Sequence, residues 1–384
     1  MKKKLSIYVH VPFCKSKCNY CDFYSVSGQD NLIAEYFKGL EDEICKTSYF
    51  NIDAEKASSI VKSIFFGGGT PGYVPAENIR RVLEILRELF IFDVDCEITL
   101  ECNPGSFDEE KIKIYKKAGI NRISLGLQST NDMILKSIGR SHKYSDYIAG
   151  IYLLRKYGFS NLNTDLMFGL PGQTLGMLME SIKDVVNLGI EHISLYSLSI
   201  EPGTLMEKLF IKSPDLFPDE DTERQMYHHG IELLKNYGFT QYEISNFAKN
   251  GKVCKHNVYC WKQNEYLGFG SAAHSFYNGI RYSNFSDINK YLYSINSEKN
   301  KILRDDNIIL SSKEKEKEFF MLGLRLIEGI NMKDFSRKFR TSPEVYINIL
   351  NKLIKRNLIE KEGDTFKMTK YGIDFANQIF VEFI

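Results

Sequence analysis

Three cysteines near the start of the chain, Cys14, Cys18 and Cys21, carry the strongest chemical signal in the sequence. They form a C-x3-C-x2-C loop that directly follows the short apolar run 5–11. Cysteine thiolates are the usual ligands of iron–sulfur clusters, and spacings of two and three residues let one short loop reach three irons of a four-iron cluster. We therefore predict that this loop binds a 4Fe-4S cluster and leaves its fourth iron open to another ligand.

Two other kinds of site would also use cysteines. A structural zinc ion needs four protein ligands, and here the fourth would have to come from a distance, for instance from His10 or Cys45. Disulfides are disfavoured because nothing resembles a secretory signal: the basic start Met1–Lys4 precedes an apolar run that His10 and Pro12 interrupt. Thiols in the cytosol stay reduced. We expect a cytoplasmic protein whose cysteines are not paired with one another.

The composition is that of a protein with sizeable cores and no strong charge bias. Of 384 residues, 43% are hydrophobic, and 50 basic side chains balance 49 acidic ones. Such a balance argues against nucleic acid as a partner. No apolar stretch approaches the roughly eighteen residues that a membrane-spanning helix requires.

Apolar runs alternate with amphipathic stretches along the first 200 residues, which indicates parallel βαβ units. The predicted helices include 31–46 and 78–89, and the predicted strands are 5–11, 61–66, 97–100, 122–127, 161–168 and 192–199. Six such units predict an α/β fold with a partial (β/α)6 barrel in residues 1–235. Residues 236–300 are expected to form a connecting region, and residues 301–384 a separate domain.

Polar residues follow several of these strands, at the end where barrel enzymes place their active sites. The glycine run Gly67–Pro71 lets backbone approach a ligand closely, although an ordinary tight turn would look the same. Glu101 and Gln128 each close an apolar strand, where a charged or amide side chain needs a partner or a polar cavity. Arg140 and Asp165 are two further charged candidates for the site. The alternative for these two residues is a structural ion pair with each other.

The stretch Tyr8-Val9-His10-Val11-Pro12-Phe13-Cys14, followed by Cys18-Asn19-Tyr20-Cys21-Asp22-Phe23, resembles the radical S-adenosylmethionine (SAM) proteins, specifically their HemN/HemW branch. The resemblance implies that the three cysteines hold a 4Fe-4S cluster and that SAM chelates its open iron. It also implies a set of residues that contact SAM, namely Tyr8, Tyr20, Gly68, Gly69, Thr70, Glu101, Gln128, Arg140 and Asp165. His142, next to this set, is a candidate proton carrier or an ordinary buried histidine.

The second half of the chain is similar to the HemW subgroup in the stretches 241–248, 255–257, 266–270 and 273–275. In that subgroup an HNxxYW segment is implicated in haem binding, and here it reads His256-Asn257-Val258-Tyr259-Cys260-Trp261. The resemblance implies His256 and Trp261 as haem contacts. The alternatives are a histidine hydrogen-bonded within its loop and a tryptophan in the core. Cys260 replaces the tyrosine of the pattern and is either a ligand or a small space-filling side chain.

The pattern changes after residue 300. A charge-dense run, 313–318, opens an amphipathic helix, and we expect its charges to pair at helical spacing. Two short helices, a hairpin formed by 358–360 and 365–368, and a final helix from Thr369 complete a mostly helical, winged-helix-like domain. Fold alone does not give function, and without a concentrated basic face we interpret this domain as a lid or interaction module.

Two function classes follow from the resemblance. The first is a haem chaperone that binds a 4Fe-4S cluster, SAM and haem, and delivers haem to acceptor proteins, respiratory ones among them, with transient membrane contact. The second is a radical enzyme such as the oxygen-independent coproporphyrinogen III oxidase, which decarboxylates porphyrinogen propionates; a radical methylase is a third, weaker reading. The oxidase carries an N-terminal extension and a further cysteine two residues after the third, where this chain has Phe23. These features favour the chaperone.

Overall fold

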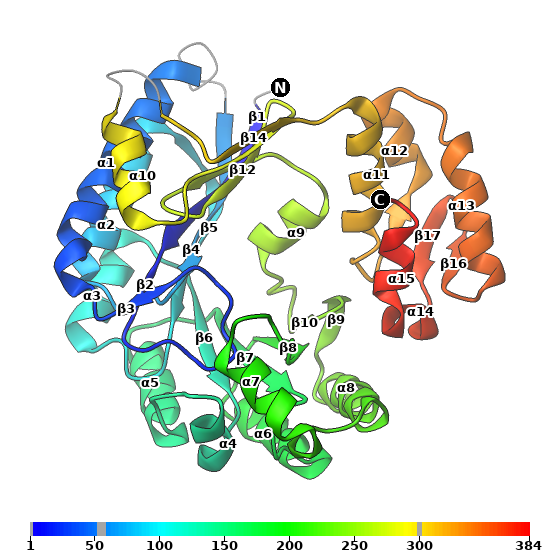
Figure 1. Cartoon of the computed structure of the whole chain (residues 1–384), viewed down its shortest axis with the longest axis horizontal. Helices are drawn as coiled ribbons and strands as arrows, with labels where there is room; N and C mark the ends of the chain where they lie inside the picture. Colours follow the sequence, from blue (N-terminus) through cyan, green and yellow to red (C-terminus); the bar gives the residue numbers. More distant parts are fainter. Residues whose placement is uncertain (1–2, 52–58, 298–301) are drawn as a thin grey trace.

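One mixed sheet organises most of the chain in this computed structural model, which describes residues 3–51, 59–297 and 302–384 (Figure 1). Within those ranges the sheet has twelve strands in the order β14-β13-β12-β11-β1-β4-β5-β6-β7-β8-β10-β9. Its centre consists of six parallel strands: β1 (Lys3–Val11), β4 (Ser59–Gly68), β5 (Ile91–Cys102), β6 (Arg122–Gln128), β7 (Leu162–Phe168) and β8 (His192–Ser197). These are the six predicted strands, so the predicted partial barrel is confirmed.

Helices cover the outer face of the six parallel strands and leave the inner face to the site (Figure 1). The covering helices are α1 (Ile33–Asn51), α2 (Ala76–Leu89), α3 (Glu109–Ala118), α4 (Asp132–Ser137), α5 (Tyr144–Lys156), α6 (Leu175–Asn187) and α8 (Glu220–Asn236). Successive side chains of a strand point to opposite faces. On β1, Ile7 and Val9 are fully buried in the core beneath the helices, whereas Tyr8 contacts Phe65 and His256 on the inner face.

Residues 240–309 extend the sheet at both edges. At one edge β11 (Tyr266–Phe269) pairs in parallel with β1 and is followed by the antiparallel strands β12 (His274–Tyr277), β13 (Ile280–Ser283) and β14 (Asp306–Ile309). At the other edge β10 (Asn246–Ala248) and β9 (Thr240–Glu243) add to β8 in antiparallel orientation. The chain crosses between these edges through α9 (Lys255–Trp261), which lies on the concave side of the sheet (Figure 1).

Shorter elements complete this part of the chain. The small strands β2 (Phe13–Cys14) and β3 (Val26–Ser27) pair with each other in the cysteine loop. Helices α7 (Leu205–Lys212) and α10 (Ile288–Asn296), with 3-10 turns at Asp30–Leu32 and Pro214–Leu216, lie in the connections. Among the described residues, no helix is both long enough and apolar enough to cross a membrane.

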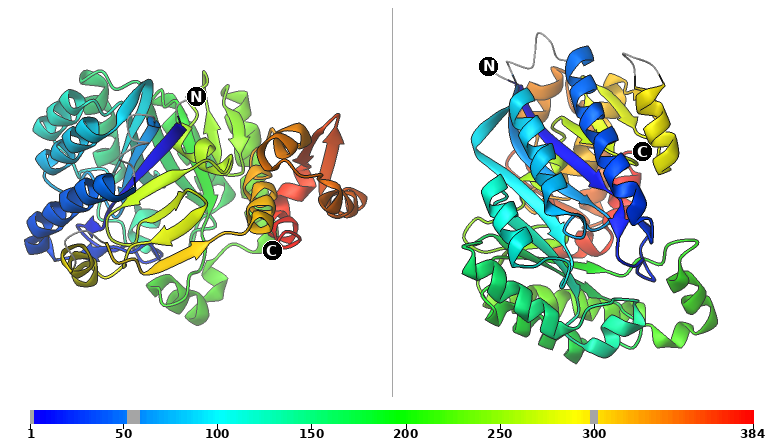
Figure 2. Two further views of the ribbon diagram at one scale, coloured as in Figure 1. Left: turned by 90° about the horizontal axis from the view of Figure 1, so that it is seen from above. Right: turned by 90° about the vertical axis from the view of Figure 1, so that its left-hand side faces the viewer.

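The C-terminal unit has a hydrophobic core of its own and lies on the side of the molecule opposite α1 (Figures 1 and 2). It contains α11 (Ser312–Gly323), β15 (Ile330–Asn331), α12 (Met332–Phe339), α13 (Glu344–Lys355), the hairpin β16 (Ile359–Glu362) and β17 (Thr365–Met368), α14 (Lys370–Asp374) and α15 (Ala376–Val381). Short helices with one β-hairpin wing are the predicted winged-helix-like arrangement.

Backbone hydrogen bonds attach this unit to the sheet edge at β9 and β10. Ile244 N–H donates to the carbonyl of Arg325 (3.2 Å), and Ile327 N–H donates to the carbonyl of Tyr242 (3.0 Å). The charge run of α11 also contributes, because Glu318 pairs with Arg281 of β13 at 3.0 Å. The expected pairing at helical spacing is therefore wrong for Glu318: its partner lies on another element.

Candidate functional site

The cysteine loop is fastened to the glycine run by backbone hydrogen bonds. Gly69 N–H donates to the carbonyl of Val11 and Thr70 N–H to that of Phe13, both at 2.9 Å. Gly68 has a φ of 109°, and a Cβ added there would lie 2.4 Å from the imidazole of His10. Only glycine fits such a position. A ligand at this turn would have to use carbonyl oxygens, because the N–H groups of Gly69 and Thr70 already hold the loop.

Hydrogen-bond donors surround two of the three half-buried thiols. Arg140 Nη1 donates to Cys18 Sγ at 3.2 Å, and the hydroxyl of Thr70 lies 3.4 Å from Cys14 Sγ. Asn103 joins these two side chains, since its Nδ2 donates to Thr70 Oγ1 (2.9 Å) and its Oδ1 accepts from Arg140 Nη2 (2.6 Å). Donors aimed at sulfur favour the thiolate form that binds metal. Burial acts in the opposite direction and raises the pKa of Cys14, which the contact with Thr70 only partly offsets.

Neither of the other cysteine chemistries finds support in this loop. None of its three thiols is in a disulfide. His10, one of the distant zinc ligands considered, uses both ring nitrogens elsewhere: Nδ1 lies 3.1 Å from the Tyr8 hydroxyl and Nε2 lies 2.9 Å from the carbonyl of Tyr24. In residues 3–51, 59–297 and 302–384, no three Cys, His, Asp or Glu side chains are grouped around a position for one metal ion.

The three thiols and nearly all predicted SAM contacts line one small cavity. Its volume is about 140 Å³, at the carboxyl ends of the parallel strands. The predicted residues that line it are Cys14, Cys18, Tyr20, Cys21, Gly68, Gly69, Thr70, Glu101, Gln128, Arg140 and Asp165. Tyr8 does not line this cavity and lies beneath it, with its hydroxyl on His10. The tertiary fold thus gathers side chains that are up to 151 positions apart, from Cys14 to Asp165.

Two carboxyl groups give this cavity its electrostatic character. Burial and the charge of Asp165 raise the pKa of Glu101 to about 8. Burial also raises the pKa of Asp165, although the side chain of Asn163 donates to it at 2.7 Å. Two desolvated acids side by side need donors or a cation to stay ionised. A ligand that carries positive charge and hydroxyl groups, as SAM does, has the matching chemistry.

Gln128 is held in a conformation that few residues adopt. Its φ is 76°, in the left-handed region, and its Oε1 accepts a hydrogen bond from the hydroxyl of Tyr196 at 3.0 Å. Arg140 and Asp165 do not form an ion pair: Nη1 and Nη2 of Arg140 bond to Cys18, Asn103 and the carbonyl of Gly126, and its buried Nε has no partner among the described residues. The structural ion pair considered as an alternative is therefore not what this geometry contains.

A second, larger cavity of about 450 Å³ begins at the cysteine loop and extends along the inner face of the sheet. Tyr20, Cys21 and Phe23 form its loop end, and Trp261 of α9 and Arg325 of the C-terminal unit form its far wall. Between them stand side chains from five strands of the barrel, among them Phe65, Glu101, Arg122, Asp165 and Tyr196. The volume is in the range of cavities that bind cofactor-sized ligands.

The two predicted haem residues occupy different positions relative to this cavity. Trp261 lines it, and the guanidinium of Arg325 lies 4.5 Å from the centre of its ring. His256 is buried below the cavity, where its Nδ1 lies 3.0 Å from the hydroxyl of Ser63 and its ring contacts Phe65. Burial lowers its pKa to about 3. This is the hydrogen-bonded arrangement considered as the alternative, and His256 would reach a ligand only if α9 moved.

The side chain of Cys260 is half-buried. Burial raises the pKa of its thiol to about 12. The side chain is absent from the cavity lining that Trp261, its neighbour, helps to form. The geometry favours the space-filling interpretation of this departure from the pattern.

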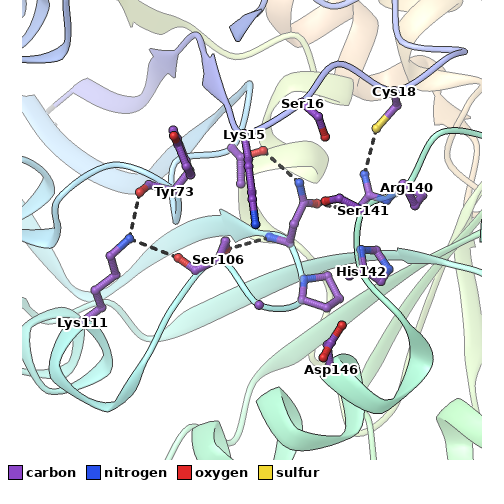
Figure 3. Close-up of a pocket in the computed structure, with 14 residues that line it drawn as sticks. Lys15, Ser16, Cys18, Tyr73, Ser106, Lys111, Arg140, Ser141, His142 and Asp146 are labelled. Atoms are coloured by element: carbon purple, nitrogen blue, oxygen red, sulfur yellow. Dashed lines mark hydrogen bonds between the residues drawn. The ribbon is translucent and has the colours of Figure 1, made fainter. Parts of the chain in front are cut away.

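A third pocket, of about 470 Å³, opens on the loops outside the barrel next to Cys18 (Figure 3). Lys111 closes one side of it and donates to the carbonyls of Gly72, Tyr73 and Ser106 at 2.8 to 3.1 Å. His142 lies on the opposite side, and burial lowers its pKa to about 4. Its buried Nε2 has no hydrogen-bond partner among the described residues, so its role as a proton carrier stays a prediction.

Sequence reasoning missed three side chains at the site. Asn103 bonds to Thr70 and Arg140, the two side chains that contact cysteine sulfurs. Its position two residues after Glu101 was the only indication of this in the sequence. Arg122 is a charged residue at the first position of an apolar strand and is 2% exposed. Arg325 gave no local signal, because only the docking of the C-terminal unit brings it to the cavity.

Comparison with known proteins identifies two domains. Residues 8–185 match the Radical SAM superfamily, and residues 310–375 match the HemN C-terminal domain. The solved structure of coproporphyrinogen III oxidase (HemN) from Escherichia coli aligns with a TM-score of 0.84 over 100% of this chain and 90% of that chain, at 22% identity. The fold and these matches define a radical SAM protein with a HemN-type C-terminal domain.

Similarity to curated proteins identifies the family of this chain within the radical SAM class. The "Heme chaperone HemW" of Bacillus subtilis (strain 168) is 36% identical over 381 residues, 99% of each chain. The proteins of that name from Lactococcus lactis (34% over 385 residues, 100% of this chain and 98% of that chain) and Escherichia coli K12 (31% over 395 residues, 99% and 98%) are similar throughout. The chain belongs to the HemW family, and membership of the radical SAM superfamily implies a 4Fe-4S cluster and SAM.

Proposed function

We propose that this protein is a haem chaperone, which binds haem beside a 4Fe-4S cluster and SAM and passes it to acceptor proteins. One observation carries the proposal: a cavity of about 450 Å³ continues inward from the cysteine loop and ends at Trp261 of the HN-containing segment. Full-length similarity to proteins named heme chaperone supports the same conclusion. The cavity has the polar and aromatic walls that a large amphipathic ligand needs.

The residues around the small cavity fit a cluster and SAM. Cys14, Cys18 and Cys21 are proposed to bind three irons, and the donors on Cys14 and Cys18 suit thiolate ligands. The proposed SAM contacts comprise the nine residues Tyr8, Tyr20, Gly68, Gly69, Thr70, Glu101, Gln128, Arg140 and Asp165. When bound, cluster and SAM together supply one-electron chemistry. The chain's own contribution is to hold these groups at the mouth of the larger cavity and to stabilise their charges.

The larger cavity is the proposed haem site, with Trp261 in its wall and His256 supporting α9 from below. The ring of Trp261 offers an aromatic face, and Phe65 and Tyr196 add further aromatic surface along the sheet. Aromatic side chains stack favourably on flat conjugated ligands. The proposal requires reduced thiols, which agrees with the cytoplasm as the expected compartment.

An anaerobic haem titration tests the proposal. The cluster-reconstituted protein would be mixed with haem, desalted, and the Soret band of the retained haem measured. Retained haem near one equivalent, followed by transfer to an apo-haemoprotein, supports the chaperone. No retained haem would contradict it.

A radical oxidase is the second candidate, because the same cavity could hold a porphyrinogen next to the SAM site. Turnover of coproporphyrinogen III with SAM and a reductant would distinguish it. Decarboxylated product in proportion to SAM consumed would favour the oxidase, and its absence in a haem-retaining protein would favour the chaperone.

A further inference from the structure

The far wall of the larger cavity contains N–H donors that meet no acceptor in the part of the chain that the structure describes. The indole Nε1 of Trp261 and the Nε of Arg325 are both shielded from solvent and make no hydrogen bond, and the Nε of Arg122 on the cavity floor is in the same state. Buried donors are nearly always paired in folded proteins, because an unpaired one loses its hydration without compensation. All three side chains line the cavity, so a ligand that enters it with acceptor groups can supply the missing partners once these side chains turn toward it.

The backbone and the side chain of Arg325 are both held by contacts with other parts of the chain. Its carbonyl accepts from Ile244 N–H at 3.2 Å, which pins the backbone to the β9–β10 turn. Its guanidinium lies over the ring of Trp261, with 4.5 Å between Cζ and the ring centre, and its Cζ is 5.6 Å from the ring centre of Phe380. Aromatic contacts on its planar group leave the edge of the guanidinium for an in-plane acceptor.

The nearby acids do not satisfy Arg325. Glu243 attracts it electrostatically, but no hydrogen bond or ion pair joins these two described side chains, and Oε1 of Glu243 accepts instead from Ser245 N–H (3.1 Å) and from the side chain of Asn246. Burial lowers the pKa of Arg325, and the nearby charge of Glu243 only partly opposes this effect. A carboxylate is the acceptor that best matches a planar guanidinium, through two parallel charge-assisted hydrogen bonds.

We propose that Arg325, together with the indole N–H of Trp261, binds a propionate carboxylate of the haem that enters the larger cavity. This inference rests on the proposed function and names the group that orients the ligand. Because Arg325 belongs to the C-terminal unit and Trp261 to α9, the ligand would also link these two parts of the chain. The C-terminal unit thereby becomes a wall of the binding site.

The test compares haem with iron protoporphyrin dimethyl ester, whose propionates carry no charge, in the cluster-reconstituted full-length protein. We expect Arg325→Gln to weaken haem binding by roughly 10- to 100-fold, the effect of losing a charge-assisted hydrogen bond. The diester should bind the unchanged protein about as weakly as haem binds the variant, and Arg325→Gln should not weaken it further. Arg325→Lys should recover part of the loss.

Several outcomes would overturn the inference. Equal haem affinity of Arg325→Gln and the unchanged protein would remove the residue from the site. An equal loss for haem and its diester would indicate a purely structural role, and a loss of SAM affinity alone would assign Arg325 to the carboxylate of SAM. Arg337→Gln, an exposed arginine of the same unit paired with Asp334, is the matched control. If the unchanged protein retains neither haem nor its diester, that result contradicts the proposed function rather than the role of Arg325.

Discussion

Arg140 donates a hydrogen bond to the thiol of Cys18 across 3.2 Å, and this contact joins the segment after α4 to the cysteine loop. The same guanidinium binds the side chain of Asn103 and the carbonyl of Gly126, so one residue connects the loop to two strands. The proposed cluster site therefore includes a contact between two residues that are 122 positions apart in the sequence.

Arg140→Gln should weaken retention of the cluster. Loss of a charge-assisted hydrogen bond to this half-buried sulfur costs about 1.5–3 kcal/mol, which corresponds to an iron affinity lower by roughly tenfold or more. Iron and acid-labile sulfide per chain, measured after reconstitution and desalting, check this. Arg155→Gln is the control, since Arg155 pairs with Glu191 away from the cysteine loop. Equal iron content in both variants would show that Arg140 is dispensable.

Replacing any one of Cys14, Cys18 and Cys21 by alanine should abolish the broad visible absorption of the reconstituted cluster, because a cubane held by two thiols is not retained. Cys260→Ala should leave both the cluster absorption and the haem affinity unchanged, since its side chain is absent from the lining of the larger cavity. The readouts are the absorption spectrum and the haem titration. A normal cluster in any of the three loop variants would refute the site.

The affinity for SAM should rise with pH through the titration of Glu101. Its pKa is about 8 in the ligand-free protein, and a cationic ligand needs the ionised carboxylate. Below pH 8 the proton must leave before the ligand binds, so the affinity should fall by up to about tenfold per pH unit between pH 8 and pH 6. Calorimetric titrations at several pH values measure this slope. Glu101→Gln should bind more weakly and show a flat profile; an unchanged slope would exclude Glu101.

His256→Ala should reduce haem retention through the position of α9 rather than through loss of an iron ligand. The imidazole is buried and bonded to Ser63, so its removal should lower the free energy of unfolding by about 1–3 kcal/mol. Chemical denaturation measures the stability, and the electron paramagnetic resonance spectrum of bound ferric haem reports its axial ligands. A changed ligand field with unchanged stability would instead make His256 a ligand. Ser63→Ala is the matched variant, because it removes the other partner of the same hydrogen bond.

The sequence pattern was sufficient to predict the features that depend on residues close together in the chain. Apolar runs that alternate with amphipathic stretches predicted the six parallel strands, because strands covered by helices are buried along most of their length. The spacing of Cys14, Cys18 and Cys21 predicted a cluster loop, since three thiols within eight residues can only serve one compact group. Glu101 and Gln128 stood out because a polar side chain that ends a buried strand requires a partner.

Other features needed contacts that no local pattern encodes. The extension of the sheet by β11 on one edge and β10 on the other depends on a crossover through α9, whose apolar residues would suit several positions. The orphaned donors of Arg122, Trp261 and Arg325 become significant only when the fold brings strand, helix and C-terminal unit to one cavity.

The sequence by itself determined the kind of chemistry: a three-cysteine loop, the polar residues that follow it on successive strands, and a barrel to carry them. Only the tertiary structure decided which side chains face each other. It turned His256 toward Ser63 beneath the cavity, set Trp261 in the cavity wall, and placed Arg325 against the indole ring. The physical reason is that strand periodicity fixes the face on which a side chain lies, whereas burial and hydrogen bonding between distant elements fix what it meets there.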